Sequence, residues 1–306
     1  MLLRLPLRGL LAGALTLIAV TAWSQPLVVA TTPDLKAIVD AVSGGTVRTA
    51  TLVPPGADPE SFEPRPSHLG LVRDAALVVR VGLGYDEWLE RLLARADGGS
   101  TSRPERGYLD ASKHVALLEV QGRSIEQASG HAHGAANPHY WLDPANGEIL
   151  GAVVAEALVR LAPDGKAEIE GAQKRFASDL RDGIERWTRQ LEPHQGASIV
   201  TYHNSWPYFA RRFRFNIVDA IEPKEGVPPS ISRLASLATK MRNAKVRLIV
   251  REPSEPPAAP QFLAERTGAR VVVLAPSVGS LPGTGAYLDL FDRNIATLAG
   301  ALAGRP

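Results

Sequence analysis

One long helical pattern restricts the fold of this chain more than any other feature. Between Asp164 and Leu191 the sequence contains no proline and is rich in Glu, Lys, Arg, Ala and Gln, which favour helices. Large apolar residues recur there at helical spacing, at Ile169, Phe176, Leu180, Ile184 and Trp187. At 1.5 Å per residue, a helix of about 28 residues is roughly 42 Å long. Such a helix runs the length of a domain or connects two domains.

Short apolar segments alternate with helical patterns on both sides of this helix. Strands are predicted at residues 27–30, 47–53 and 76–81, and beyond Pro193 at 198–202, 216–220, 246–250 and 270–274. This alternation is typical of parallel sheets with crossover helices. The sequence therefore predicts an α/β fold of two lobes, each a mainly parallel sheet flanked by helices. One long helix joins the lobes, and a cleft lies between them.

The first 24 residues have the pattern of an export signal. Arg4 and Arg8 precede an apolar run from residue 9 to about residue 22, and the small residues of Ala22-Trp23-Ser24 predict cleavage before Gln25. The run is shorter than the ~20 residues of a membrane-spanning helix, although an uncleaved anchor is the alternative. We expect a signal peptide at 1–24, an N-terminal lobe at 25–163, a linking helix at 164–192, a C-terminal lobe at 193–306, and a periplasmic location.

The composition excludes several classes of protein and site. The chain has no cysteine, which excludes disulfides, thiol nucleophiles, iron–sulfur clusters and cysteine-bound zinc. It carries 34 Lys+Arg against 32 Asp+Glu, and loss of Arg4 and Arg8 with the leader would leave 32 of each. This balance argues against a nucleic-acid-binding protein. Any metal ion must therefore be held by nitrogen and oxygen atoms.

Four segments near predicted element boundaries carry side chains that can bind a ligand. They are residues 58–67, 137–144, 201–205 and 251–253, and they contain Glu60, His139, His203 and Glu252. Ligands of α/β proteins gather beyond the carboxyl ends of the strands, so these side chains could converge in one cleft. Each has a simpler interpretation as well: a hydrogen-bonded structural histidine, a solvated loop carboxylate, or a helix-capping carboxylate at Glu252.

Together these segments resemble the solute-binding proteins of zinc- and manganese-type ABC transporters, in which a rigid helix joins two lobes. The similarity covers nearly all of the chain after the leader. It is carried by Phe62-Glu63-Pro64-Arg65-Pro66-Ser67, by Pro138-His139-Tyr140-Trp141-Leu142-Asp143-Pro144, by His203 with Tyr208-Phe209, and by Gly285-Ala286-Tyr287-Leu288-Asp289 with Asn294.

The resemblance implies a metal site made by a His from the first loop, a His from the second, a His or Glu from the third, and an Asp after the last strand. On that pattern His139 and His203 carry over directly. Glu60 stands where the first His is usual, and Ala275 falls at the place of the usual Asp. The expected site is therefore not the standard one.

Glu252 occupies a place where the family often has a glutamate, and it is our candidate for the missing carboxylate. Glu222 and a water molecule are the alternatives for this fourth position. Two imidazoles with one or two carboxylates suit Zn²⁺, and also Mn²⁺ or Fe²⁺. Affinity alone favours zinc over manganese, so Zn²⁺ is the predicted ligand.

Three further histidines could contact a metal ion. His131 and His133 resemble a shortened form of the His-rich loop of some zinc-binding relatives, and a solvated loop with two incidental histidines is the alternative. His68 begins a predicted helix where the family usually has Asp, and a capping or surface role is expected for it.

The predicted function is that of a monomeric periplasmic receptor, not an enzyme, that captures a divalent ion and delivers it to an ABC permease. A metal-dependent hydrolase is an alternative, because an open coordination position could activate water. The chain has neither a His-Glu-x-x-His motif nor a nucleophile elbow, however. A receptor for manganese, iron or another solute is a further alternative, given the altered ligand set.

Overall fold

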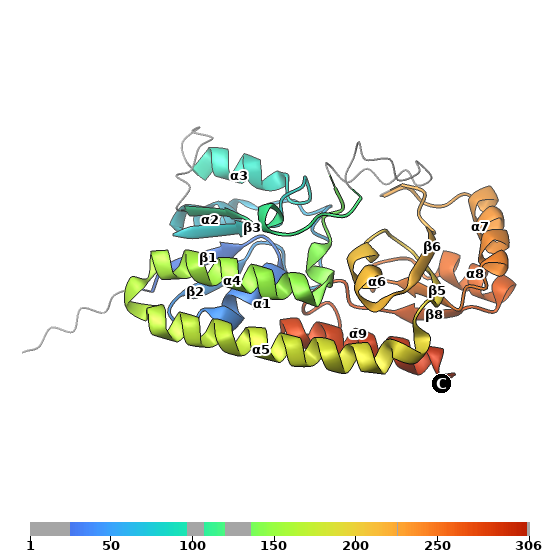
Figure 1. The fold of residues 1–306 in the computed structure, drawn as a ribbon. Coiled ribbons are helices and arrows are strands. Elements are labelled where there is room, and N and C mark those ends of the chain that lie inside the picture. Colours follow the sequence, from blue (N-terminus) through green and yellow to red (C-terminus); the bar gives the residue numbers. More distant parts are fainter. Residues whose placement is uncertain (1–24, 97–106, 120–135, 225, 305–306) are drawn as a thin grey trace, which may run out of the picture.

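The computed structural model describes residues 25–96, 107–119, 136–224 and 226–304. These residues form two four-stranded sheets, one in each half of the chain, with helices on both sides (Figure 1). The predicted signal peptide, His131 and His133 lie outside the described residues. Within the described parts, no helix is both long and apolar enough to span a membrane.

The N-terminal sheet contains β1 (Leu27–Ala30), β2 (Arg48–Thr51), β3 (Leu77–Arg80) and β4 (Tyr108–Asp110) in the order β2-β1-β3-β4. The C-terminal sheet repeats this plan with β5 (Ser198–Thr201), β6 (Asn216–Ala220), β7 (Leu248–Arg251) and β8 (Arg270–Val273) in the order β6-β5-β7-β8. Every pairing within the two sheets is parallel. All seven predicted strands are present, with ends shifted by up to two residues; β4 was missed, because a three-residue strand has almost no sequence pattern.

A helix follows each strand, as the alternating pattern predicts. In the first lobe these helices are α1 (Pro33–Val42), α2 (Pro66–Asp74), α3 (Trp88–Ala96) and α4 (Pro144–Leu161). In the second they are α6 (Pro207–Phe213), α7 (Ile231–Asn243), α8 (Ala258–Thr267) and α9 (Tyr287–Leu302). Several begin with proline at the first helical position, where the missing N–H has no cost.

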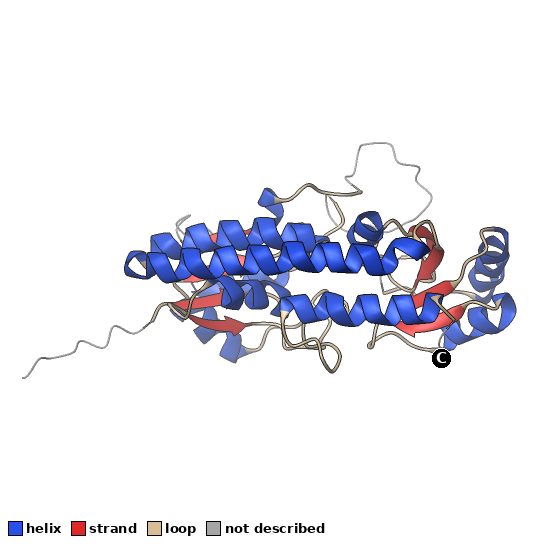
Figure 2. Ribbon diagram, turned by 60° about the horizontal axis from the view of Figure 1, so that its bottom comes forward, coloured by secondary structure: helices blue, strands red, loops and turns tan. Residues whose placement is uncertain are grey.

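The long helix is α5 (Lys166–Leu191), which runs beneath both lobes with α9 beside it (Figures 1 and 2). It begins two residues later than predicted, because residues 163–165 form a 3₁₀ turn. Its predicted apolar positions are buried in the core, except Ile184, which is partly buried. Gly147 lets α4 pack closely against Tyr287 at the start of α9, since a Cβ at position 147 would lie 2.3 Å from the Tyr287 ring.

One hydrophobic core extends through both lobes, and each lobe has a second core on its other face. Alternate residues of a strand point to opposite faces of the sheet, and the burial follows this period. Val28 and Leu248 join the shared core with α1, α4, α5, α6 and α9, whereas Val29 and Ile249 face the separate cores beneath α2–α3 and α7–α8. The two lobes are therefore packed together through a continuous apolar interior.

Candidate metal centre

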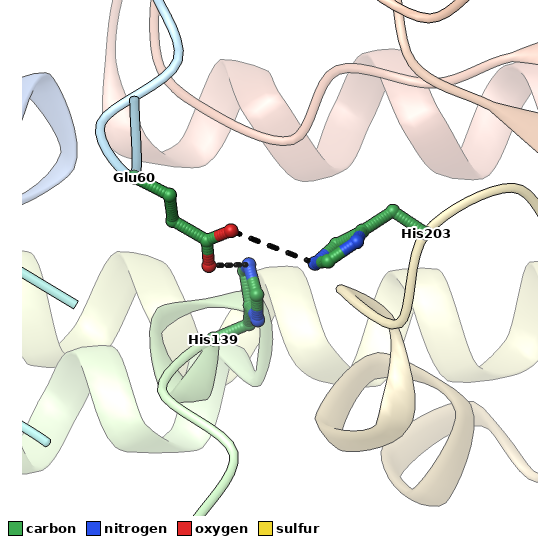
Figure 3. A group of neighbouring side chains, drawn as sticks. All are labelled: Glu60, His139 and His203. Carbon is green, nitrogen blue, oxygen red and sulfur yellow. Dashed lines mark ion pairs between the residues drawn. The ribbon is translucent and has the colours of Figure 1, made fainter. Parts of the chain in front are cut away.

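Glu60, His139 and His203 converge between the two lobes (Figure 3). One possible metal-binding atom from each residue lies within 4.8 Å of the others. Among the described residues, these three make up the group of His, Asp and Glu side chains that could hold a metal ion. Glu60 Oε1 is 3.7 Å from His139 Nε2, and Glu60 Oε2 is 3.9 Å from His203 Nε2. The carboxylate thus faces both imidazoles. Three of the four predicted site residues are brought together by the fold.

The three side chains come from different connections that leave carboxyl ends of parallel strands. Glu60 lies between β2 and α2, His139 between β4 and α4, and His203 between β5 and α6. This is the edge at which α/β sheets bind ligands. The prediction that these loops converge therefore follows from the parallel topology, although the distances could come only from the packing of the two lobes.

His139 is buried at 3% exposure in a segment that contacts both lobes. Its backbone N–H donates to Asn137 Oδ1 at 3.0 Å, and the rings of Tyr85 and Trp141 lie 5.3 and 5.2 Å from its own ring. Trp141 Nε1 donates to the Pro276 carbonyl of the second lobe at 2.9 Å. The imidazole is therefore held by aromatic packing and by backbone contacts.

His203 is contacted by two glutamates of the second lobe. Its Nδ1 lies 2.7 Å from Glu222 Oε2, and its backbone N–H donates to Glu255 Oε1 at 3.1 Å. Because a carboxylate accepts, Nδ1 is the donor, and in the neutral ring Nε2 then carries the lone pair that a metal ion needs. Glu222 therefore lies behind the His203 ring, on the side away from Glu60.

Glu60 is carried by an exposed loop. Its backbone N–H donates to Asp58 Oδ1 at 2.9 Å, and the Ser61 hydroxyl donates to Asp58 Oδ2 at 2.8 Å. The loop is tied to the rest of the lobe by Trp88 Nε1, which donates to the Pro59 carbonyl at 3.0 Å. The Glu60 side chain itself is only 13% exposed, because it points inward between the histidines.

The three residues line a cavity of about 440 Å³ that is rich in carboxylates. Asp58, Glu222, Glu252 and Glu255 line it as well, and its described lining contains no Lys or Arg. A cavity of one charge sign raises the local concentration of ions of the opposite sign. The site therefore suits a cation and disfavours an anionic ligand.

Comparison with known proteins agrees with this geometry. The family described as "Zinc-uptake complex component A periplasmic" matches residues 28–301. The chain belongs to this family. A relative in Paracoccus denitrificans, "High-affinity zinc uptake system protein ZnuA", is 29% identical over 315 residues, which cover 92% of this chain and 93% of the relative.

Two other similar proteins extend the comparison. "Manganese-binding lipoprotein MntA" of Halalkalibacterium halodurans is 25% identical over 276 residues, which cover 87% of this chain and 85% of the relative. The solved structure described as "Crystal structure of 138-173 ZnuA deletion mutant plus zinc bound" has a TM-score of 0.76 and 25% identity, and covers 92% of this chain and 99% of that one. The predicted family and the two-lobe α/β fold are therefore confirmed.

The resemblance predicts that Ala275 takes the place of the usual aspartate, and the structure shows what holds that segment. Ala275 is fully buried, its N–H donates to Asn294 Oδ1 at 2.8 Å, and its carbonyl accepts from Asn294 Nδ2 at 2.8 Å. Asn294, part of the family resemblance, thus fixes the backbone after β8. The methyl side chain of Ala275 cannot bind a metal ion.

Glu252, the predicted replacement for that aspartate, lines the cavity but does not join the three-residue group. Its Oε1 accepts a hydrogen bond of 2.5 Å from the Ser205 hydroxyl. Burial raises its pKa, and the nearby His203 opposes this shift. The carboxylate is therefore committed to a contact inside the second lobe.

Glu255 is the residue that our sequence analysis missed. Its two oxygens accept from the backbone N–H groups of His203 and Glu252, the latter at 2.5 Å. Burial, followed by the charge of Glu252, raises its pKa to about 9. A second glutamate three residues after Glu252, between prolines at 253 and 256, was the signal that could have drawn attention to it.

His68 has the capping role that was expected for it. Its Nδ1 accepts from the backbone N–H of Arg65 at 2.9 Å at the start of α2. Burial and the Arg65 charge lower its pKa, which keeps the ring neutral and able to accept. It does not belong to the three-residue group.

Proposed function

We propose that this chain is a periplasmic solute-binding protein that captures one divalent metal ion, zinc in preference to manganese or iron, and delivers it to an ABC permease. The observation that carries the proposal is the convergence of Glu60, His139 and His203 in an acidic cavity between the lobes. Membership of the zinc-uptake family supports it, as do relatives named for zinc and for manganese.

The proposed ligands are Glu60 through a carboxylate oxygen, His139 through Nε2 and His203 through Nε2. Two nitrogen ligands and one oxygen ligand suit zinc, which takes four ligands in a tetrahedron. We propose that water completes the shell, since Glu252 already accepts a hydrogen bond from Ser205. Glu252 is the alternative fourth ligand, after rotation away from Ser205.

Metal content of the mature protein is the direct test. Equilibrium dialysis against Zn²⁺ followed by mass spectrometry should give about one zinc per chain in wild type and none in a His139→Ala, His203→Ala double variant. Competition with Mn²⁺ should leave zinc bound, because zinc binds such ligands more tightly. A wild-type protein that retains no divalent ion after dialysis would contradict the proposal.

A Glu252→Gln variant tests the fourth position. It keeps the size of the side chain and an oxygen that can accept from Ser205, but removes the charge. Zinc affinity within about threefold of wild type would support water as the fourth ligand. A loss of about 100-fold would identify Glu252 as a ligand, since the removal of a ligand costs at least as much as that of an outer-shell partner.

We also propose that the protein binds without turnover. A zinc ion held by three side chains has an open position that could activate water, as in hydrolases. The capture role uses the same open position for loading and release. Assays of the zinc-loaded protein with ester, amide and phosphate substrates should show no hydrolysis above that of the His139→Ala variant.

The remaining parts of the proposal concern export and organisation. We propose a signal peptide at 1–24 cleaved before Gln25, lobes at 25–163 and 193–306 joined by the segment at 164–192 that contains α5, and a monomer in solution. The mass of protein purified from the periplasm checks the cleavage site. Light scattering checks the monomer, and co-purification with the permease checks the partner.

A further inference from the structure

His203, one of the proposed ligands, makes a short and nearly buried polar contact with Glu222. Glu222 Oε2 lies 2.7 Å from His203 Nδ1, and the two side chains are 11% and 12% exposed. Contacts of this kind, buried and between a charged acceptor and a ring nitrogen, are stronger than neutral hydrogen bonds.

The backbone around Glu222 is positioned by the sheet. Beyond the ends of β5 and β6 the parallel pairing continues, with the N–H of Ile221 donating to the Thr201 carbonyl and the N–H of Glu222 donating to the Tyr202 carbonyl at 3.0 Å. Glu222 is thereby placed beside His203 in the neighbouring connection. The position of the carboxylate therefore depends on rigid elements rather than on a free loop.

The backbone of His203 is fixed from the other side. Glu255 Oε1 accepts its N–H at 3.1 Å, and Glu255 Oε2 accepts the N–H of Glu252 in the connection after β7. Because the main chain of His203 is held there, its imidazole can move mainly by rotation about the side-chain bonds. The contact with Glu222 removes the choice between ring orientations and between tautomers.

We propose that Glu222 is a positioning residue for metal capture: it holds His203 in the tautomer with the proton on Nδ1 and turns Nε2 toward Glu60 and His139. The inference rests on the proposed metal-binding function and adds a residue that does not touch the ion. Histidines that bind metal ions commonly donate their other ring N–H to a carboxylate or carbonyl, which fixes the ring and makes it a stronger ligand.

The two proposed histidine ligands differ in this respect. His139 Nδ1 lies 3.3 Å from the neutral amide oxygen of Asn137, whereas His203 Nδ1 lies 2.7 Å from a carboxylate. A Glu222→Gln variant converts the second arrangement into one like the first. The amide oxygen can still accept, but it attracts the Nδ1 proton less strongly than a carboxylate.

The test combines a spectroscopic and a binding measurement. Two-dimensional ¹⁵N NMR of the metal-free protein, with His203 assigned by a His203→Gln variant, should show His203 protonated on Nδ1 in wild type. Glu222→Ala should give a mixture of tautomers. Zinc affinity by chelator competition should fall about 10- to 100-fold in Glu222→Ala and less in Glu222→Gln, because the loss of such a partner typically has this effect.

Asp219, which lies on β6 three residues before Glu222, provides the matched control. It is a carboxylate that is 10% exposed and pairs with Arg233 and Lys240, away from the three-residue group. Asp219→Asn should lower the melting temperature and leave the His203 tautomer and the zinc affinity unchanged. This control separates loss of stability from loss of positioning.

The outcomes distinguish this inference from the proposed function. If wild type binds zinc and folded Glu222→Ala binds it equally well, the positioning role is wrong and the function stands. If wild type binds no metal but shows the Nδ1–H tautomer, lost in Glu222→Ala, the contact orders His203 and the proposed function fails. A wild-type His203 protonated on Nε2 overturns the inference directly, and the isosteric Glu222→Gln keeps the test valid if Glu222→Ala does not fold.

Discussion

The segment that carries His139 and the loop that carries Glu60 contribute to one site in opposite ways. Residues 136–143 are all buried, and the segment is bonded to the second lobe: Asn137 Nδ2 donates to the Asn204 carbonyl, and the Tyr208 hydroxyl donates to the Asn137 carbonyl, both at 2.9 Å. Residues 54–65 are largely exposed, and the Glu60 turn is stabilised mainly by the local Asp58 contacts and by Trp88.

This difference predicts different stabilities against local opening. Segments with few buried contacts open at low cost, whereas buried and cross-bonded segments open only with the whole fold. We therefore expect the segment around His139 to open only with the whole fold, and the Glu60 loop to open locally. Mutations in the two regions should therefore separate stability from metal affinity.

The largest effect is expected from the aromatic residue beside His139. Trp141 is 1% exposed, and its replacement by alanine should lower the free energy of unfolding by about 3–5 kcal/mol, as for other large aromatic residues in cores. Phe62 is the matched aromatic residue of the Glu60 loop and is only partly buried; Phe62→Ala should cost no more than about 2 kcal/mol. Urea denaturation measures both, and equal losses would contradict the comparison.

Glu60→Ala should have the opposite effect: a large loss of zinc affinity with little loss of stability. Removal of a ligand should weaken zinc binding by about 100-fold, which corresponds to about 2.7 kcal/mol of binding free energy. The free energy of unfolding without metal should change by no more than about 1 kcal/mol, because the loop that carries Glu60 is largely exposed. Calorimetric titration and urea denaturation provide the two numbers. A large loss of stability would mean that the loop is part of the rigid core.

Arg212→Ala tests a contact between the lobes. Arg212 Nε lies 2.7 Å from Oδ1 of Asp143, a buried carboxylate that also caps α4 by accepting from the N–H of Ala145. Loss of the partner should cost about 2 kcal/mol; this is less than for a fully buried pair, because Arg212 is 34% exposed and Arg211 stays 3.6 Å from Asp143. Thermal unfolding measures the loss, and Arg212→Lys should recover part of it.

The smallest effect is a dependence on pH. Asp34 bonds across the lobes, accepting from the Ser277 hydroxyl at 2.6 Å and the Val278 N–H at 2.9 Å, yet burial raises its pKa from 3.8 to about 6. The folded state therefore binds this proton more tightly than the unfolded state. Stability from this group rises as pH falls through 6 and levels off below 4, and the gain from pH 7 to pH 5 is about 1 kcal/mol.

Asp34→Asn isolates that contribution, because the amide does not titrate. As pH falls from 7 to 5, the unfolding free energy of wild type should rise by about 1 kcal/mol relative to that of Asp34→Asn. A difference that does not change with pH would show that Asp34 titrates normally in the folded protein.

Much of the fold and part of the site could be predicted from the sequence. The positions of seven strands and of α5 followed from periodicity and from the absence of proline. His139 and His203 were predicted as ligands from the family resemblance, and Glu60 from its place in the first loop; the structure brings the three together. The short strand β4 could not be predicted, since three residues contain too little pattern to distinguish a strand from a loop.

The sequence by itself determined the parallel α/β architecture, the long helix and the residue types available for a metal ion, because these depend on local periodicity and on composition. Only the tertiary structure decided which carboxylate faces both histidines. Glu60 points between the histidines, Glu222 stands behind His203, and Glu252 turns to Ser205. The reason is that these glutamates come from separate connections, and only the packing of the two lobes sets their distances.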